Sequence, residues 1–197
     1  PDLPVALLLL VMFVASVVSG ALWGVIPGYF KAKIKANETL FTLMMNYVAI
    51  QLVKFFVVLW EKQKGAGVMS TLTTGKLPQL FGVDYGWSIV IILVITVLSY
   101  VYMKYSKQGY EIAVVGESEN TARYIGINVN KVIVRTMALS GALCGLAGFL
   151  LVSGTHHLVK SDIVGGNGFT AIIVAWLAQL NPLTMVITSF FVSFLDI

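Results

Sequence analysis

The sequence predicts an all-α protein that forms a polytopic bundle of transmembrane helices, with a final helix that is broken or re-entrant. Hydrophobic residues make up 58% of the 197 residues and charged residues only 11%, against roughly 25% charged in ordinary soluble domains. The mean hydropathy is +0.89. The apolar runs, for example residues 5–14 and 89–98, also lack the alternation that barrel strands show over about 10 residues.

The composition also disfavours several classes of function. A soluble globule needs more polar residues to cover its surface, so we do not expect a soluble enzyme, a nucleic-acid-binding domain or a disordered chain. In a membrane protein the formal net charge of +4 bears on orientation in the lipid and does not indicate a nucleic-acid partner. Cys144 is the single cysteine, so it cannot form an intrachain disulfide.

Four runs with few or no charges are each long enough to cross the hydrocarbon core, which takes about 20 helical residues. They are residues 3–30, 39–60, 85–103 and 136–159. Because backbone groups in lipid need internal partners, we predict that each run is a helix. The length suits a single transmembrane domain over residues 1–197. Since the first residue is Pro1 and the last residues carry no polar tail, we expect a fragment that is truncated at both ends.

A fifth uncharged run, residues 163–195, is too long for one regular span and must break. Pro182 has no backbone N–H and pushes Asn181 out of helical geometry. We therefore predict a half-helix over 169–180 and a second helix over 183–195. The half-helix is too short to span alone, and the pattern leaves open whether it re-enters the membrane or continues as a kinked span.

The connections between spans differ in charge. Residues 31–37 and 104–135 together carry twice as many Lys and Arg residues as 61–84 and 156–168. The positive-inside rule places the first pair in the cytoplasm. Residues 104–135 are accordingly predicted to form a cytoplasmic loop.

Small residues recur every four positions in two of the predicted spans, at Ser16, Gly20, Gly24 and Gly28 and again at Gly141 and Gly145. This spacing places them on one helix face, where small side chains let another helix approach closely. Two interpretations stay open: static helix packing, or a helix pair that slides during function.

Polar side chains interrupt the second predicted span at Asn46, Gln51 and Lys54. Lys54 is near the end of the span and can extend to the interface. Asn46 lies deeper, where a polar group usually faces the interior of a bundle or a wet cavity. We predict that Asn46 lines a pathway or bonds to another helix.

The loop over 104–135 contains signals for a short helix of two turns between flexible glycines. Ser118 is a good N-cap, Glu119 and Arg123 can pair across one turn, and Gly126 is a natural stop. Ala122 and Ile125 would lie among charged neighbours. The segment is either a solvated loop helix or a docking element for a soluble partner.

No catalytic or metal-binding pattern is visible. His156 and His157 are adjacent and would point apart on a helix, so a metal site with Asp162 is disfavoured. The glycine-rich residues 165–168 lack the Lys-Ser/Thr that follows in a phosphate-binding loop. We expect no metal, no cofactor and no enzymatic activity in this chain.

Several of these stretches together resemble the inner-membrane permease subunits of bacterial ABC importers, in the branched-chain amino acid/ribose-type superfamily. The finer similarity is to permeases for nucleosides and simple sugars. The resemblance is carried by residues 20–28, 37–49, 109–127, 140–148 and 168–182. Glycine-rich helices are common in membranes, so the order and spacing of the stretches carry more weight than any one of them.

The resemblance implies a subunit that forms the translocation pathway in the bacterial plasma membrane. ATP hydrolysis would occur on partner ATPase subunits, a second permease subunit would complete the pathway, and an extracytoplasmic lipoprotein would deliver the substrate. The short loop helix would couple the ATPase to transport, through Gly116, Glu117, Ala122, Arg123, Tyr124 and Gly126.

Other classes are weighed against this one. A secondary transporter would favour acidic residues in the middle of its spans, whereas Glu38 lies only at a span edge. An intramembrane enzyme would need paired catalytic groups, and a structural subunit would show no transport. A permease for another small solute, such as a branched-chain amino acid, is the remaining alternative.

Overall fold

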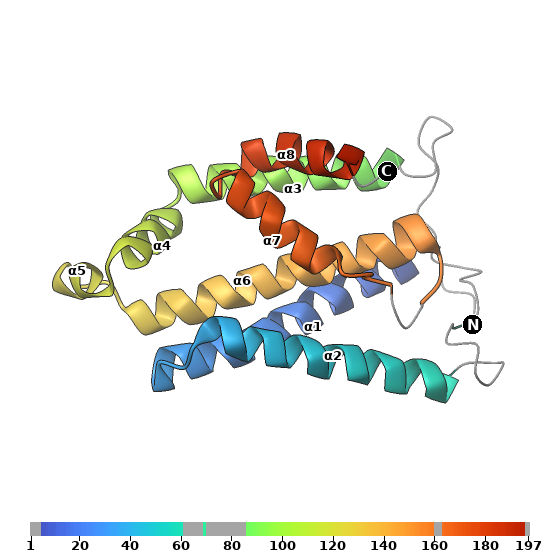
Figure 1. Cartoon of the computed structure of the whole chain (residues 1–197), viewed down its shortest axis with the longest axis horizontal. Helices are drawn as coiled ribbons and strands as arrows, with labels where there is room; N and C mark the ends of the chain where they lie inside the picture. The colour runs from blue at the N-terminus through green and yellow to red at the C-terminus, as the bar shows by residue number, and fades with distance from the viewer. Residues whose placement is uncertain (1–4, 61–68, 70–85, 160–162, 196–197) are drawn as a thin grey trace. The chain divides into compact units, whose positions relative to one another are not determined.

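The computed structural model describes residues 5–60, 69, 86–159 and 163–195, and these residues form helices and no strands. The chain order is α1 (Val5–Ile34), α2 (Glu38–Trp60), α3 (Gly86–Tyr105), α4 (Lys107–Glu117), α5 (Glu119–Tyr124), α6 (Val129–Phe149), the π-helical η1 (Leu150–His156), α7 (Asn167–Leu177) and α8 (Pro182–Leu195) (Figure 1). The all-α prediction is confirmed.

Within the part of the chain that the structure describes, four helices are long and apolar enough to cross a membrane, and they correspond to the four predicted spans. The fourth, formed by α6 and η1, begins at Val129 and not at residue 136 as predicted. The reason is a local cap, because the side chain of Asn128 accepts a hydrogen bond from the backbone N–H of Lys131 at 3.2 Å. Lys131 and Arg135, which the sequence analysis assigned to the loop, therefore lie in the first two turns of α6.

The contacts group the chain into two compact units. The first unit contains Pro1–Ser88 and Glu111–Ile163, and its main feature is the packing of α1 along α6. In the same unit α2 contacts α1, and α5 contacts α6. Asn37 caps α2, since its side chain accepts from the N–H of Thr39 at 3.1 Å. This cap allows α2 to turn back directly after α1.

The second unit contains Ile89–Tyr110 and Val164–Ile197, and in it α7 and α8 meet at a corner (Figure 1). The predicted break before Pro182 is confirmed: Asn181 accepts from the N–H of Leu183 at 3.1 Å, and Pro182 is the first residue of α8. However, α7 ends at Leu177 and not at 180. Gln179 and Leu180 have φ angles of 50° and 59°, which turn the chain before the proline.

The helix α4 was missed by sequence reasoning, which expected flexible chain around Gly116. Its start is capped by Ser106, whose hydroxyl accepts from the N–H of Gly109 at 2.9 Å and donates to the carbonyl of Tyr102 at 2.6 Å. Gly109 is buried, and a Cβ at this position would lie only 2.6 Å from the carbonyl oxygen of Tyr102. A residue with a side chain therefore does not fit there. Glycine is usually a poor helix residue, so its presence concealed α4 in the sequence pattern.

Candidate functional site

The glycines predicted to pack helices meet one another between α1 and α6. A Cβ placed on Gly20 would lie 2.9 Å from Cα of Gly145, and one on Gly24 would lie 3.1 Å from Cα of Gly141. Such distances leave no room for side chains, so the two backbones are in direct contact. We call this contact the glycine seam.

The glycine seam runs antiparallel along both helices. Towards one end, a Cβ on Gly28 would lie 2.9 Å from Cβ of Met137. Towards the other end, the rings of Phe13 and Phe149 pack edge to face with centroids 5.9 Å apart. The chain therefore turns from α1 into α2 at the same end of the seam at which α6 begins. This agrees with the prediction that residues 31–37 and 104–135 lie on the same side of the membrane.

A hollow of about 920 Å³ lies between α1, α2 and α6 in the first unit. From α2 it is lined by Thr42, Met45, Asn46, Ala49 and Val53, whose spacing marks one helix face. The remaining lining comes mainly from the two helices of the glycine seam. Every lining side chain is uncharged. The volume falls in the range of about 300–1,000 Å³ that small-molecule sites occupy.

Asn46 supplies an amide group to this hollow. Within the described residues its side chain has no hydrogen bond, so both its donor and its acceptor are available. Lys54, which lies near the end of the same span, does not line the hollow. The structure therefore separates the two polar positions.

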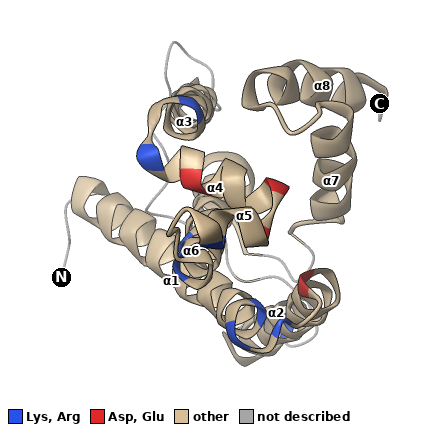
Figure 2. Ribbon diagram, turned by 90° about the vertical axis from the view of Figure 1, so that its left-hand side faces the viewer, with Lys and Arg blue, Asp and Glu red and all other residues tan. Residues whose placement is uncertain are grey.

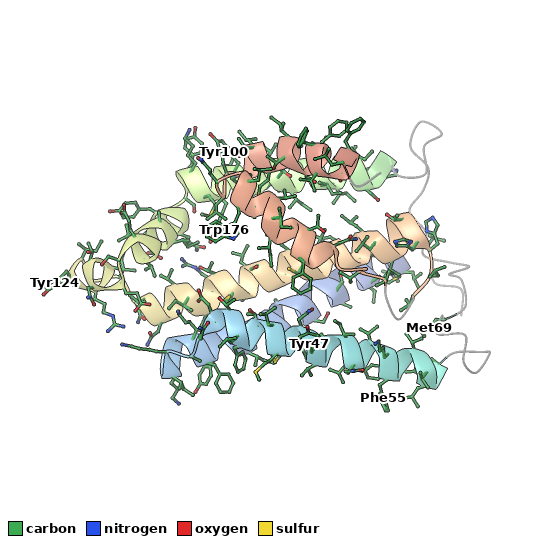
Figure 3. All side chains as sticks on the ribbon, in the orientation of Figure 1. Tyr47, Phe55, Met69, Tyr100, Tyr124 and Trp176 are labelled. Carbon is green, nitrogen blue, oxygen red and sulfur yellow. The ribbon has the colours of Figure 1, made fainter. Side chains whose placement is uncertain are left out.

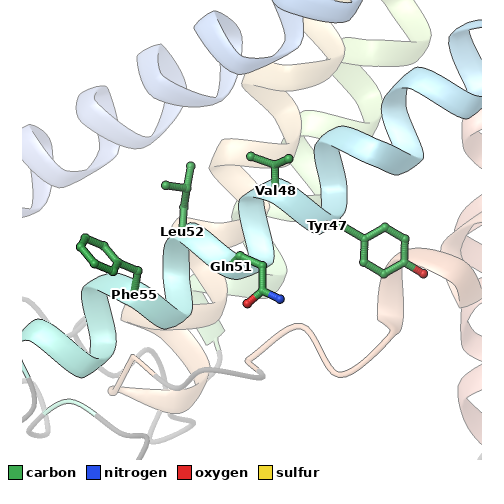
Figure 4. Close-up of a pocket in the computed structure, with 5 residues that line it drawn as sticks. All are labelled: Tyr47, Val48, Gln51, Leu52 and Phe55. Atoms are coloured by element: carbon green, nitrogen blue, oxygen red, sulfur yellow. The ribbon is translucent and has the colours of Figure 1, made fainter.

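A second, more open hollow of about 510 Å³ is lined only by residues of α2, namely Tyr47, Val48, Gln51, Leu52 and Phe55 (Figure 4). One helix alone cannot enclose a solute. We therefore treat these five side chains as an exposed face of α2 and not as a binding site.

The predicted loop helix is present as α5, and its local geometry is as predicted. Ser118 is extended, with φ −160° and ψ 116°, and its hydroxyl accepts from the N–H of Thr121 at 3.3 Å. Arg123 lies 3.8 Å from Glu119 across one turn. After the helix Gly126 has a φ of 82°, and the N–H of Ile127 bonds to the carbonyl of Ala122 at 2.9 Å. This is a Schellman ending, which holds the last turn of α5 in a defined conformation.

The six residues predicted for coupling differ in exposure. Ala122 is fully buried, and α5 contacts α6. The other five residues are exposed, and Tyr124 is 91% exposed and extends away from the end of α5 (Figure 3). Gly116 is the last but one residue of α4, and a Cβ there would meet no atom within 4 Å. Of the six residues, Ala122 is therefore buried, and the other five form an exposed surface, which we call the outer face of α5.

Basic residues gather at the end of the first unit where α5 lies. Figure 2 views this end and shows Lys and Arg around the turn from α1 to α2 and on α6. Lys31 forms a half-buried ion pair of 3.4 Å with Glu38 across this turn. The arrangement agrees with a cytoplasmic location for this end.

An ion pair between α4 and α6 was missed by sequence reasoning. The Nη2 of Arg135 lies 3.0 Å from the Oε2 of Glu111, with side-chain exposures of 35% and 20%. The partners are distant in sequence, and α4 had not been predicted. An arginine in the first turns of a membrane helix was the available signal, since such a residue usually needs a partner.

The described residues contain no group of three or more His, Cys, Asp or Glu placed to hold a metal. Asp162, the third member of the disfavoured metal site, is outside the described residues. The glycines at 165 and 166 have φ angles of 50° and 83° and lead into α7.

The family described as branched-chain amino acid transport system/permease component matches residues 3–197. The chain is 30% identical over 195 residues to a guanosine ABC transporter permease protein of Bacillus subtilis, which covers 95% of this chain and 56% of the relative. It is 27% identical over 205 residues to a glucose ABC transporter permease protein of Haloferax volcanii, with coverages of 96% and 54%. A nucleoside ABC transporter permease protein of Lactococcus lactis is 25% identical over 211 residues, with coverages of 100% and 57%. The chain spans about half the length of these relatives, and no solved structure matches it.

Proposed function

Because this chain belongs to the family of permease components of branched-chain amino acid transport systems, we propose that it forms part of the membrane-spanning subunit of an ATP-driven importer for nucleosides or simple sugars. Permease components are transport proteins and not enzymes, so the ATP is hydrolysed on a partner chain. Four helices long enough to cross a membrane suit a multi-pass protein of the plasma membrane. The names of the three relatives, which are permeases for guanosine, glucose and nucleosides, favour nucleosides and sugars as the solutes.

The observation that best supports this proposal is the geometry of α5. The helix is capped at both ends, contacts α6, has Ala122 fully buried, and leaves Arg123 and Tyr124 exposed. A partner that binds this outer face can move α6, because α5 is held in one conformation. Motion of α6 in turn acts on α1 through the glycine seam and changes the hollow between them.

The proposed assembly has three further components. ATPase subunits dock on the exposed residues Gly116, Glu117, Arg123, Tyr124 and Gly126, while the buried Ala122 holds α5 in place. A second permease subunit completes the pathway, and an extracytoplasmic lipoprotein delivers the solute. The hollow with Asn46 is the part of the pathway contributed by these residues, since its uncharged lining suits a neutral, hydrogen-bonding solute.

The test is to reverse the charge of the outer face without disturbing the fold. Gly116→Asp places a carboxylate in open space, and Arg123→Glu replaces an exposed ion pair with two like charges one turn apart, which costs only a few tenths of a kcal/mol. In the complete complex reconstituted in vesicles, we expect both variants to lower solute uptake about tenfold or more, since removing a docking contact typically costs 1–3 kcal/mol. ATP hydrolysis should lose its stimulation by the loaded binding protein.

The matched control is Lys107→Gln, which removes an exposed charge from α4 outside the docking face. This variant should transport normally. Unchanged uptake and unchanged ATPase stimulation in both test variants would reject docking at α5. Solute uptake by the complex without any ATPase subunit would reject the whole function.

A further inference from the structure

The ion pair between Glu111 and Arg135 links α4 to the start of the helix that the proposed ATPase would move. Among the described residues no Cα of α4 lies within 8 Å of a Cα of α6, so long side chains bridge the two helices. The bridge is short, with 3.0 Å between Nη2 of Arg135 and Oε2 of Glu111. The Glu111 side chain is 20% exposed and the Arg135 side chain 35% exposed, and Nε of Arg135 is buried with no hydrogen-bond partner among the described residues.

The short distance and the low exposure of Glu111 set this pair apart from the other ion pairs of the described residues. Lys31–Glu38 and Glu119–Arg123 are longer, at 3.4 and 3.8 Å, and their glutamates are more exposed, at 51% and 43% against 20% for Glu111. Exposed pairs contribute little because water and salt screen them. A sheltered pair depends on both partners, because removal of one leaves an uncompensated charge.

The position of the pair on α6 gives it a mechanical consequence. The α5 helix contacts α6, to whose first residue, Val129, it is joined by residues 125–128, while Arg135 is six residues further along, which corresponds to about 9 Å of helix. If the α4–α5 segment were attached to α6 at one point only, that point would act as a pivot, and a push on α5 would rotate the segment without tilting α6. Two points separated along the axis transmit a tilt.

The second attachment is also next to the place where the glycine seam begins. A Cβ on Gly28 of α1 would lie 3.3 Å from Cα of Val134, the residue before Arg135. A force applied through Arg135 therefore enters α6 where its backbone already touches α1. From there it reaches the hollow lined by both helices.

We propose that Glu111 and Arg135 are positioning residues that fasten α4 to α6, so that movement of the α4–α5 segment tilts α6 and opens or closes the solute hollow. This inference rests on the proposed function. In this proposal the Glu111–Arg135 pair transfers the motion to α6, and α5 makes the contact with the ATPase. Loss of the pair should leave ATPase binding intact and should reduce the number of solute molecules moved for each ATP hydrolysed.

The experiment uses the complete complex with its ATPase and loaded binding protein in vesicles, and measures uptake and ATP hydrolysis together. Glu111→Gln and Arg135→Gln should each assemble, hydrolyse ATP and lose about tenfold in the ratio of uptake to hydrolysis, as expected for a broken coupling contact. The exchanged pair Glu111→Arg with Arg135→Glu should recover most of this ratio. Lys131→Gln, an exposed charge on the same helix, is the matched control and should behave as the wild type.

A second experiment tests the same role if the single variants fail to assemble. Glu111→Cys and Arg135→Cys are combined in a protein without other cysteines and are joined by a short bis-maleimide spacer. The spacer should restore coupling that is lost in the unlinked double variant. Unaltered coupling in the single variants, or no recovery either by charge exchange or by the spacer, would overturn the fastening role. A wild-type complex that imports nothing with ATP would overturn the proposed function itself, which is a different outcome.

Discussion

Glycine has opposite uses in the glycine seam and in the segment that contains α4 and α5. In the seam Gly24 and Gly141 have ordinary helical backbones. Glycine is needed at these positions because the backbone of the facing helix occupies the space of a side chain. At the end of α5 Gly126 has open space around it, and it is needed because φ is 82°. Gly116 meets neither condition. The comparison teaches that a glycine in a membrane protein indicates close packing only when a partner surface is known.

The largest expected effect comes from filling the seam. Gly24→Leu places a branched side chain where only 3.1 Å separates a Cβ from the Cα of Gly141. The helices must separate, so we expect the free energy of unfolding to fall by about 3 kcal/mol or more, at the upper end of overpacking effects. Thermal unfolding of the detergent-solubilised protein, with size-exclusion chromatography, measures this loss.

The control for this variant is Gly148→Leu, on the same helix as Gly141 but with no atom within 4 Å of its Cβ position. It should retain nearly the wild-type melting temperature. Equal losses in both variants would show that leucine is harmful anywhere on α6, and would remove the distinction between the seam and an open glycine.

A smaller effect is expected at the end of α5. Gly126→Val must adopt a left-handed backbone, which costs about 1–2 kcal/mol for a residue with a Cβ. We expect the Schellman ending to open, so that the amide of Ile127 exchanges its hydrogen about tenfold faster or more. Gly126→Asn should change this rate far less, because Asn tolerates the left-handed region. Similar rates in the two variants would contradict a conformational role for this glycine.

The smallest effect is expected for the exposed pair on α5. Glu119→Gln removes a 3.8 Å contact between two largely solvated side chains. The expected change in the free energy of unfolding is below about 0.5 kcal/mol, and it should vanish in high salt. Thermal melts at low and high salt concentration measure it. A loss above 1 kcal/mol would indicate that this pair is organised in a way the distance does not suggest.

The parts of the fold that could be predicted are those decided within a few residues. Ser118, Gly126 and Pro182 each act on their immediate neighbours, so the caps of α5 and the break before α8 were legible in the sequence. Prediction failed where an unusual residue occupies a familiar motif. Gln179 has a left-handed φ at a Schellman ending where glycine is usual, so the end of α7 was placed too late.

The sequence by itself determined the number of membrane-length helices, the short capped helix and the family, because hydrophobic length and local capping depend only on neighbouring residues. Only the tertiary structure decided that Gly20 faces Gly145, that Asn46 and not Lys54 lines the hollow, and that Glu111 meets Arg135. These pairings join residues that are far apart along the chain. Helical spacing tells which residues share a face, but the register between two helices follows from how closely their surfaces fit.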